Sequence, residues 1–266
     1  MEEKLQLRLY GDELLPTLIY LPGLHGDWTL IGAFRHAVAG RVRFVEMTYP
    51  RTLTWSLDDY AAAIEQVLLE NGVTRGWLLG ESFGSQLAWA MAARNQNSHA
   101  AKGDSAPFQI DGIILAGGFV RHPLQRLVRL AERAAGVIPL RLLITVIFGY
   151  AKVARFRFRR SPEILERLDE FIERRTELDR QAAVHRLHLI AESDFRSVAR
   201  GTNLPVFALS GLLDPIVPWP LVRRWLRHHC PALRDYRLIH RADHNVLGSG
   251  TREAARLVLR WLKCET

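Results

Sequence analysis

The sequence contains little cysteine and no apolar stretch long enough to cross a bilayer. Its two cysteines, Cys230 and Cys264, form no C-x-x-C pair, so they offer neither a disulfide framework nor a cysteine-based zinc site. The most apolar stretch, residues 142–151, is well short of the roughly 20 residues that a membrane-spanning helix needs. The charged first residues lead into no apolar segment, so we expect no signal peptide and a cytoplasmic protein.

Acidic residues are fewer than basic ones. The chain has 28 Asp and Glu against 36 Lys and Arg, which gives a formal net charge of +8 that comes mostly from arginine. A basic balance can indicate nucleic acid, anionic lipid or acidic substrates as partners. The arginines are scattered, although denser between residues 141 and 186, and no nucleic-acid motif or aromatic platform accompanies them. We therefore expect a solvated basic surface and no nucleic-acid partner; the oligomeric state is left open.

What the sequence does contain is the composition of a globular protein, with 48% hydrophobic and 24% charged residues. Short apolar runs alternate with longer amphipathic segments, which predicts an α/β protein with a mostly parallel, doubly wound sheet. The predicted strands are residues 5–9, 17–21, 43–47, 76–80, 112–116, 206–210 and 235–239. The predicted core helices are residues 28–38, 56–70, 83–94, 218–228 and 251–263, and residues 95–109 are predicted to form a mobile surface loop.

Residues 119–200 interrupt this alternation because they contain no convincing strand. Four helices are predicted there, over residues 124–135, 140–148, 161–176 and 178–191. A long helical segment between two strands of a parallel sheet is typical of a lid. We therefore predict a core made of residues 1–118 and 201–266, with a helical lid inserted at residues 119–200.

The strongest chemical motif lies where a predicted strand meets a predicted helix. Gly80, Glu81, Ser82, Phe83 and Gly84 form a G-x-S-x-G sequence at this junction. A sharp strand-to-helix turn holds such a serine in strained backbone geometry, and small neighbours let strand and helix approach closely. Although the motif alone is common and the serine could merely cap the helix, its position predicts that Ser82 is a nucleophile. The backbone N–H of Phe83 would then face a developing oxyanion.

A nucleophilic serine needs a base, and the base needs an orienting acid. After an elbow of this type, the acid and then the histidine follow the serine along the chain. Asp214 follows the predicted strand 206–210, and His244 follows the predicted strand 235–239. Because the carboxyl ends of parallel strands meet at one edge of the sheet, we predict a catalytic triad of Ser82, His244 and Asp214.

Other residues compete for the roles of acid and base. Asp243 adjoins His244 in the sequence, and a direct neighbour cannot easily reach the Nδ1 atom of that ring. His240 stands too early, at the strand end, and Asp111 precedes its strand, which places it at the opposite edge of the sheet. Asp214 taken alone also has a plain structural interpretation, as a turn residue before proline.

A second oxyanion donor is expected in the loop after the predicted strand 17–21. That loop reads L-P-G-L-H-G-D over residues 21–27, and its glycines allow backbone N–H groups to point inward. We predict that the N–H of Leu24 is this donor. His25 is interpreted as a loop residue, with a direct role in binding as the alternative.

With these motifs the chain resembles the α/β-hydrolase superfamily over essentially its whole length. It is particularly similar to small bacterial hydrolases that carry an L-P-G-L loop, a G-E-S-F elbow and an F-V-R-x-P segment, here residues 119–123. Pro22 stands where the superfamily often has histidine. The resemblance implies the α/β-hydrolase fold, the same triad and oxyanion residues, and hydrolysis of ester-type bonds.

The resulting hypothesis is a serine hydrolase that cleaves a carboxylic ester or thioester through an acyl-enzyme, without metal or organic cofactor. Acyl transfer with the same triad is the nearest alternative, and a receptor-like protein with slow turnover is another. The substrate is predicted to be a small molecule with an apolar acyl group. Glu81 is expected to form a hydrogen bond within the elbow, or else to tune specificity.

The apolar part of the predicted lid, residues 140–150, allows three interpretations. Its helix packs against the core, lines a hydrophobic acyl tunnel, or docks on a membrane surface with help from the arginines at 155–160. Membrane contact is the weakest of these expectations.

Overall fold

The computed structural model describes residues 4–100, 108–138 and 176–263, and the side chains of residues 97–100 are not described. Seven strands form one sheet, in the order β1-β3-β2-β4-β5-β6-β7. Edge strand β1 is antiparallel to β3, and the other neighbouring strands are parallel. The strands are β1 Gln6–Tyr10, β2 Thr17–Leu21, β3 Arg43–Thr48, β4 Arg75–Glu81, β5 Gln109–Ala116, β6 Val206–Gly211 and β7 Leu233–Ile239.

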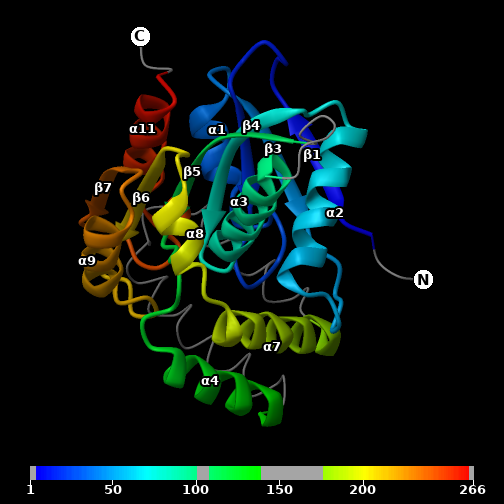
Figure 1. The fold of residues 1–266 in the computed structure, drawn as a ribbon, viewed down its shortest axis with the longest axis vertical. Helices are drawn as coiled ribbons and strands as arrows, with labels where there is room; N and C mark the ends of the chain where they lie inside the picture. Colours follow the sequence, from blue (N-terminus) through cyan, green and yellow to red (C-terminus); the bar gives the residue numbers. More distant parts are fainter. Residues whose placement is uncertain (1–3, 101–107, 139–175, 264–266) are drawn as a thin grey trace.

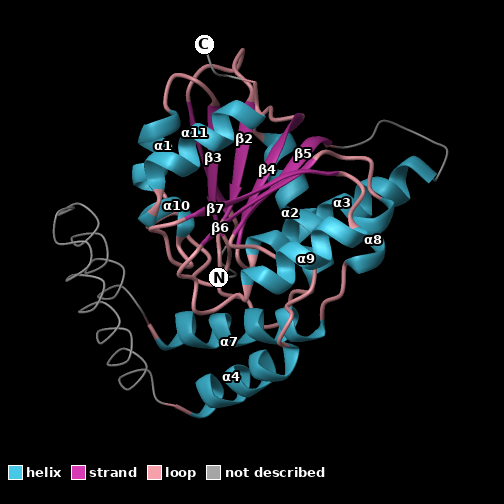
Figure 2. Ribbon diagram, turned by 90° about the vertical axis from the view of Figure 1, so that its left-hand side faces the viewer, coloured by secondary structure: helices cyan, strands magenta, loops and turns pink. Residues whose placement is uncertain are grey.

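Helices cover both faces of this sheet, as Figure 2 shows. One face carries α1 Gly32–Val38, α10 Val246–Ser249 and α11 Thr251–Trp261, and the other carries α2 Leu57–Glu70, α3 Gly84–Ala100, α8 Arg196–Gly201 and α9 Trp219–His229. All five residues of β2 are buried, because a strand covered on both faces has no solvent side. The fold is therefore the predicted doubly wound, mostly parallel α/β sheet.

The chain between β5 and β6, called the insertion below, contributes α4 Gln125–Val137 and α7 Glu177–Glu192 before α8. Figures 1 and 2 show α4 and α7 lying together across one end of the sheet. The Gln125 side chain joins them by donating to the carbonyls of Ala191 and Ser193, at 3.2 and 3.3 Å. The predicted lid helix 140–148 lies outside the described residues, as does the predicted helix 161–176 except for its last residue, Thr176, which caps α7.

Helix α7 is tied to the core by polar side chains. The Arg51 guanidinium meets Asp179 at 2.6 Å, and the His185 ring forms a 2.8 Å hydrogen bond with the Trp55 carbonyl. Thr176 caps the helix through a reciprocal pair of bonds with Asp179. The beginning of α7 is therefore fixed both locally and against the core.

All seven predicted strands are confirmed, whereas some helix boundaries were wrong. Helix α3 continues to Ala100, where the sequence predicted a loop from residue 95; Asn95 donates to the Phe108 carbonyl at 3.1 Å and stabilises this extension. Helix α1 begins at Gly32 rather than at 28, because the Asp27 side chain accepts the Thr29 N–H at 2.9 Å and forms a turn first. Helices α8 and α10 were not predicted.

Candidate active site

Ser82 lies at the turn between β4 and α3. Its φ of 49° is in the left-handed region, which a residue with a Cβ rarely adopts. A Cβ at position 84 would come within 2.0 Å of the Leu21 carbonyl oxygen, and one at position 80 within 2.8 Å of the Ser85 backbone. The two glycines of the motif are therefore required by close backbone approach, and the serine is held in a strained conformation.

A continuous chain of hydrogen bonds links three strand ends. The Nε2 atom of His244 lies 2.9 Å from Ser82 Oγ, and its Nδ1 atom lies 2.8 Å from Asp214 Oδ2. Ser82 follows β4, Asp214 follows β6 and His244 follows β7. Three residues that are far apart in the sequence therefore converge at one edge of the sheet, with the geometry that a proton relay requires.

The Asp214 carboxylate is fixed by two further contacts. Its side chain is fully buried, and its Oδ1 atom accepts the backbone N–H groups of Ile216 and Val217 at 2.8 and 2.9 Å. The other oxygen remains directed at His244. Asp214 is thus both the turn residue of the plain interpretation and the partner of the imidazole.

The competing residues have other partners or are exposed. Asp243 accepts the N–H of Asn245 at 3.1 Å within its own loop. Asp111 pairs with Arg75 at 2.6 Å, at the beginning of β4 and away from Ser82. His240 is exposed at the end of β7.

Two contacts fix the peptide groups on either side of Leu24. The Gly23 carbonyl accepts the Gly26 N–H at 3.0 Å, and the Leu24 carbonyl accepts from Arg186 Nη1 at 2.9 Å. Because the carbonyl and the next N–H of a trans peptide point in opposite directions, these bonds also set the direction of the following N–H groups. Phe83 directly precedes α3, at a helix end whose first N–H groups lack intrahelical acceptors.

A cavity of about 360 Å³ contains Ser82 and His244 in its lining. The strand ends and loops at the sheet edge supply these two residues and also Gly23, Leu24, Glu81 and Asn245. The insertion supplies apolar side chains from α4 and α7. Among the latter are Leu127, Val128, Leu187 and Ile190. The cavity therefore combines a small polar constellation with a mostly apolar wall, as ligand pockets commonly do.

A model of the alpha/beta hydrolase fold matches residues 47–250 of the chain, which is well over half of it. The chain belongs to the alpha/beta-hydrolase family. It is therefore an enzyme of the hydrolase type that acts on a small molecule. No curated protein matches the sequence.

Solved structures of other alpha/beta hydrolases are similar to this chain in fold. A hydrolase from Pseudomonas aeruginosa PA01 shares 15% sequence identity and a TM-score of 0.77, over 97% of this chain and 94% of that one. An enol-lactonase from Burkholderia xenovorans LB400 shares 16% identity and a TM-score of 0.77, over 97% and 96%. A thermophilic esterase from Thermogutta terrifontis shares 20% identity and a TM-score of 0.73, over 98% and 94%.

Sequence reasoning missed Arg186, a residue of α7 that contacts the loop after β2 in this hydrolase. Its side chain is 2% exposed and donates to the carbonyls of Leu24 and Pro50 at 2.9 and 3.2 Å. Gly26, with a φ of 78°, leaves the space it occupies, because a Cβ there would lie 2.4 Å from Arg186 Nη1. No sequence pattern distinguishes Arg186 from the many other arginines of the chain.

His122 was also missed, although the sequence marked its segment, 119–123, as a motif. Its ring is 7% exposed, packs edge-on against Phe119 and lines the cavity. Burial lowers the pKa of His122 below its ordinary value of 6.5, with a smaller contribution from the nearby His244. A second, neutral imidazole therefore lies beside the Ser82 cavity.

The partner of Glu81 differs from the one expected. Its carboxylate accepts a short hydrogen bond from the hydroxyl of Tyr20 on the neighbouring strand β2, and not from the elbow. Burial, and then the charge of Glu81, raise the pKa of Tyr20 well above its ordinary value. The phenol therefore stays protonated and stabilises the carboxylate next to Ser82.

Among the described residues, no helix has the length and hydropathy to span a bilayer. The same part of the chain holds no group of three or more His, Cys, Asp or Glu side chains arranged for a metal ion.

Proposed function

We propose that this hydrolase cleaves carboxylic esters or thioesters through an acyl-enzyme on Ser82. The observation that carries the proposal is the unbroken relay from Ser82 Oγ through His244 to the buried Asp214, at 2.9 and 2.8 Å. A hydroxyl is a weak nucleophile at neutral pH, and this relay supplies both the base and the group that orients it.

In the first half-reaction, His244 Nε2 accepts the Ser82 proton as Oγ attacks the acyl carbonyl carbon. The oxyanion that forms is held by the N–H groups of Leu24 and Phe83. When the tetrahedral intermediate collapses, His244 gives its proton to the departing alcohol or thiol. Asp214 keeps the proton on Nδ1 and stabilises the imidazolium form.

In the second half-reaction, water takes the place of the alcohol. His244 accepts a proton from this water as it attacks the acyl-enzyme, and then returns the proton to Ser82 Oγ, which releases the carboxylic acid. The two proposed oxyanion donors are backbone groups of turns that directly follow strands β2 and β4, so they need little reorganisation during the reaction. Loss of one such donor typically lowers turnover about 100- to 1000-fold.

The insertion is proposed to act as the lid over this site and to hold the acyl group. Support comes from the apolar side chains that α4 and α7 direct into the Ser82 cavity, among them Val128, Leu187 and Ile190. An apolar acyl chain would gain about 25 cal/mol for each Å² of surface that it buries there. The names of the esterase and the enol-lactonase described above indicate cleavage of ester-type bonds, which is the reaction proposed for this chain.

The proposal is tested with p-nitrophenyl esters of two to twelve acyl carbons and with a fluorophosphonate probe that labels activated serines. We expect turnover of the apolar esters and labelling of the wild-type protein, and loss of both in Ser82→Ala. Ser197→Ala, which removes an exposed serine of α8 outside the cavity lining, is the matched control. Turnover that survives Ser82→Ala would overturn the proposal, and added alcohols would separate acyl transfer from hydrolysis.

A further inference from the structure

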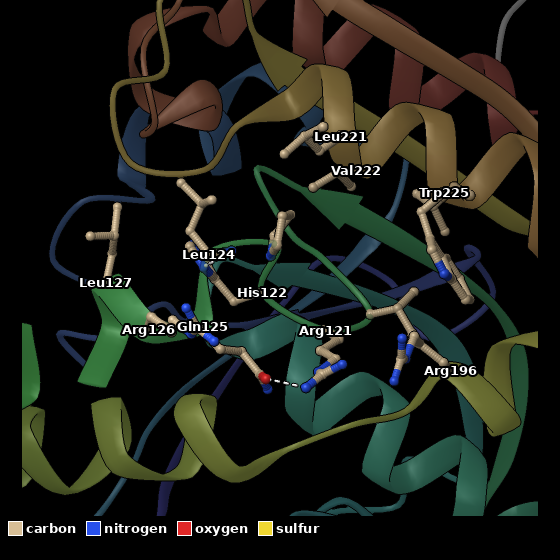
Figure 3. Close-up of a pocket in the computed structure, with 13 residues that line it drawn as sticks. Arg121, His122, Leu124, Gln125, Arg126, Leu127, Arg196, Leu221, Val222 and Trp225 are labelled. Carbon is tan, nitrogen blue, oxygen red and sulfur yellow. Dashed lines mark hydrogen bonds between the residues drawn. The ribbon is translucent and has the colours of Figure 1, made fainter. Parts of the chain in front are cut away.

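A second cavity of about 470 Å³ lies beside the Ser82 cavity. Its walls come from the segment that enters α4, from Arg196 at the beginning of α8 and from the first turns of α9 (Figure 3). His122 and Leu127 line both cavities, so the two spaces are neighbours with a shared wall. The reaction proposed above makes no use of this second cavity, called the arginine cavity below.

The charge of the arginine cavity has one sign. Among the described residues that line it, the charged ones are Arg121, Arg126 and Arg196, and none is a carboxylate. Figure 3 shows Arg121 and Arg196 on the same side of the cavity, across from Leu221 and Val222 of α9. Arginine binds carboxylate and phosphate oxygens through paired N–H groups, so guanidinium groups that line a cavity favour an anion there when part of their N–H groups stays available.

Two of these guanidinium groups are held in place by a residue outside the lining. Asp194 accepts from Arg196 Nε at 2.8 Å and Nη2 at 2.6 Å, and it lies 3.7 Å from Arg121 Nε. The Nη2 atom of Arg121 donates to the Gln125 side chain. Neither Nη1 atom makes a hydrogen bond to a described residue, so each guanidinium is oriented by its other nitrogens and keeps one donor group for a ligand.

The remaining wall of the arginine cavity is apolar. Leu124, Leu127 and Leu221 line it while 39%, 56% and 48% exposed, and the buried Val222 and the half-buried Trp225 also line it. Exposed large apolar side chains gathered around one concave site are typical of ligand binding. The cavity therefore offers an apolar surface next to cationic groups.

We propose that the arginine cavity binds an anionic group, a carboxylate or a phosphate, carried on an apolar body. For the hydrolase proposed above, the natural source is the alcohol portion of the substrate. The acyl group would occupy the Ser82 cavity, and the leaving alcohol would extend past His122 with its anionic end at Arg121 and Arg196. This assignment of the substrate rests on the proposed function, whereas the binding site itself does not.

Binding is measured first, in the Ser82→Ala protein, where turnover is not involved. Titration calorimetry at low salt compares octanoate, octyl phosphate and 1-octanol, so that carboxylate, phosphate and neutral ligands of equal chain length are ranked. The variants are Arg121→Gln/Arg196→Gln and, as control, Arg129→Gln. Arg129 is a half-exposed arginine of α4 that pairs with Glu192 and does not line the cavity.

We expect both anions to bind at least tenfold more tightly than 1-octanol, and the double variant to lose at least tenfold affinity for them. Arg129→Gln should leave the affinity nearly unchanged. The anion that binds more tightly identifies which anionic group, carboxylate or phosphate, the cavity prefers. Anion binding that is equal in the double variant and in Arg129→Gln would overturn the proposal, as would failure of both anions to bind better than 1-octanol.

If the double variant does not fold, the exposed Leu221 gives a second test. Leu221→Glu places a carboxylate at the apolar rim and should weaken octanoate binding at least fivefold relative to Leu221→Gln, which has the same size without the charge. Equal binding by these two variants would count against the site. Because Leu221 is half-exposed, neither change is expected to disturb the fold.

Turnover is then measured with the carboxylate 6-(octanoyloxy)hexanoate and the neutral hexyl octanoate. We expect wild-type kcat/KM to favour the carboxylate, and the double variant to reduce at least tenfold the ratio of kcat/KM for the carboxylate over that for hexyl octanoate. Turnover of hexyl octanoate without an arginine-dependent preference would overturn the subsite and leave the proposed function intact. Arginine-dependent binding of anions without turnover of any ester would support the subsite and contradict the proposed function.

Discussion

The two sides of the Ser82 cavity are built in different ways. On the sheet side, Ser82, Asp214 and His244 each follow a strand whose backbone is fixed in the sheet, and their side chains form one connected relay. On the insertion side, α4 and α7 lie across the sheet end and contribute apolar side chains to the cavity. We therefore propose that the sheet side provides the catalytic groups and that the insertion limits the shape of the substrate that fits.

Arg186 is the exception that joins the two sides. It belongs to α7, yet its hydrogen bonds are with the backbone of the loops after β2 and β3. Its contact with Leu24 reaches the loop that we propose for oxyanion binding. We therefore expect the apolar residues of the insertion to affect only which substrate fits, and Arg186 to affect the catalytic step as well.

The largest effect is expected on the sheet side, from Asp214→Asn. An amide in place of the carboxylate no longer stabilises the imidazolium or fixes the His244 tautomer, so kcat should fall on the order of 10³- to 10⁴-fold. Ester hydrolysis in the steady state measures this. Asp243→Asn is the matched control, since Asp243 is the acid next to His244 in the sequence; a loss as large in that variant would contradict the assignment of Asp214.

Arg186→Met should lower kcat by about 10- to 100-fold, which is smaller than the loss of a whole oxyanion donor. Methionine has the length of the side chain but none of its donors, so the peptide between Leu24 and His25, which directly follows the proposed donor N–H of Leu24, is no longer held. Affinity for a trifluoromethyl ketone, which forms an oxyanion on the serine, should fall together with kcat, while KM changes little. Arg186→Lys should recover part of both losses.

A purely structural role for Arg186 would give a different pattern. The thermal midpoint would then fall in Arg186→Met, while kcat and the affinity for the trifluoromethyl ketone, both measured well below that midpoint, would stay at wild-type values. This result would mean that no residue of the insertion takes part in the catalytic step through the loop after β2.

The shape of the insertion side is tested by Ala131→Phe. Ala131 is an exposed residue of α4 that lines the Ser82 cavity, so a phenyl ring there should shorten the acyl chain that fits. We expect the ratio of kcat/KM for the dodecanoyl over the butanoyl ester to fall by about tenfold. Arg133→Phe, on the exposed surface of the same helix, should leave this ratio unchanged; equal ratios in both variants would mean that α4 does not limit the acyl group.

The smallest effect concerns stability and His122, at the wall between the two cavities. Because burial lowers its pKa, the folded protein keeps the ring neutral at a pH where the unfolded chain already binds a proton. Well above pH 6.5, the ordinary pKa of the ring, the lowered pKa of His122 does not change the free energy of unfolding. As the pH falls below 6.5, it lowers the free energy of unfolding progressively. His122→Gln should therefore lose less free energy of unfolding between pH 7 and pH 5 than the wild type.

Denaturant titrations at both pH values measure this difference. The exposed His228 provides the control, since His228→Gln should follow the wild-type pH dependence. A His122→Gln protein that loses as much stability on acidification as His228→Gln would show that the ring is not held neutral.

Strands are easier to predict from this sequence than the ends of helices. The central strands were found because a parallel strand buried on both faces is apolar along most of its length, as in β2 and the end of β5. Helix ends were less predictable: α3 continues through Asn95 and Gln96, whose polar side chains suggest a loop until their contacts with Phe108 and Val198 are known. Those contacts join segments that are distant in the chain.

The sequence by itself determined the order of strands and helices, the elbow around Ser82 and the positions of Asp214 and His244 after strands, because each depends on local pattern and chain order. Only the tertiary structure decided that these three side chains lie within hydrogen-bond distance, that Arg186 reaches Leu24, and that Arg121 and Arg196 share Asp194. The physical reason is that the burial of a charged side chain, and the partner with which it pairs, depend on which distant segment of the chain packs beside it. No local pattern encodes that partner.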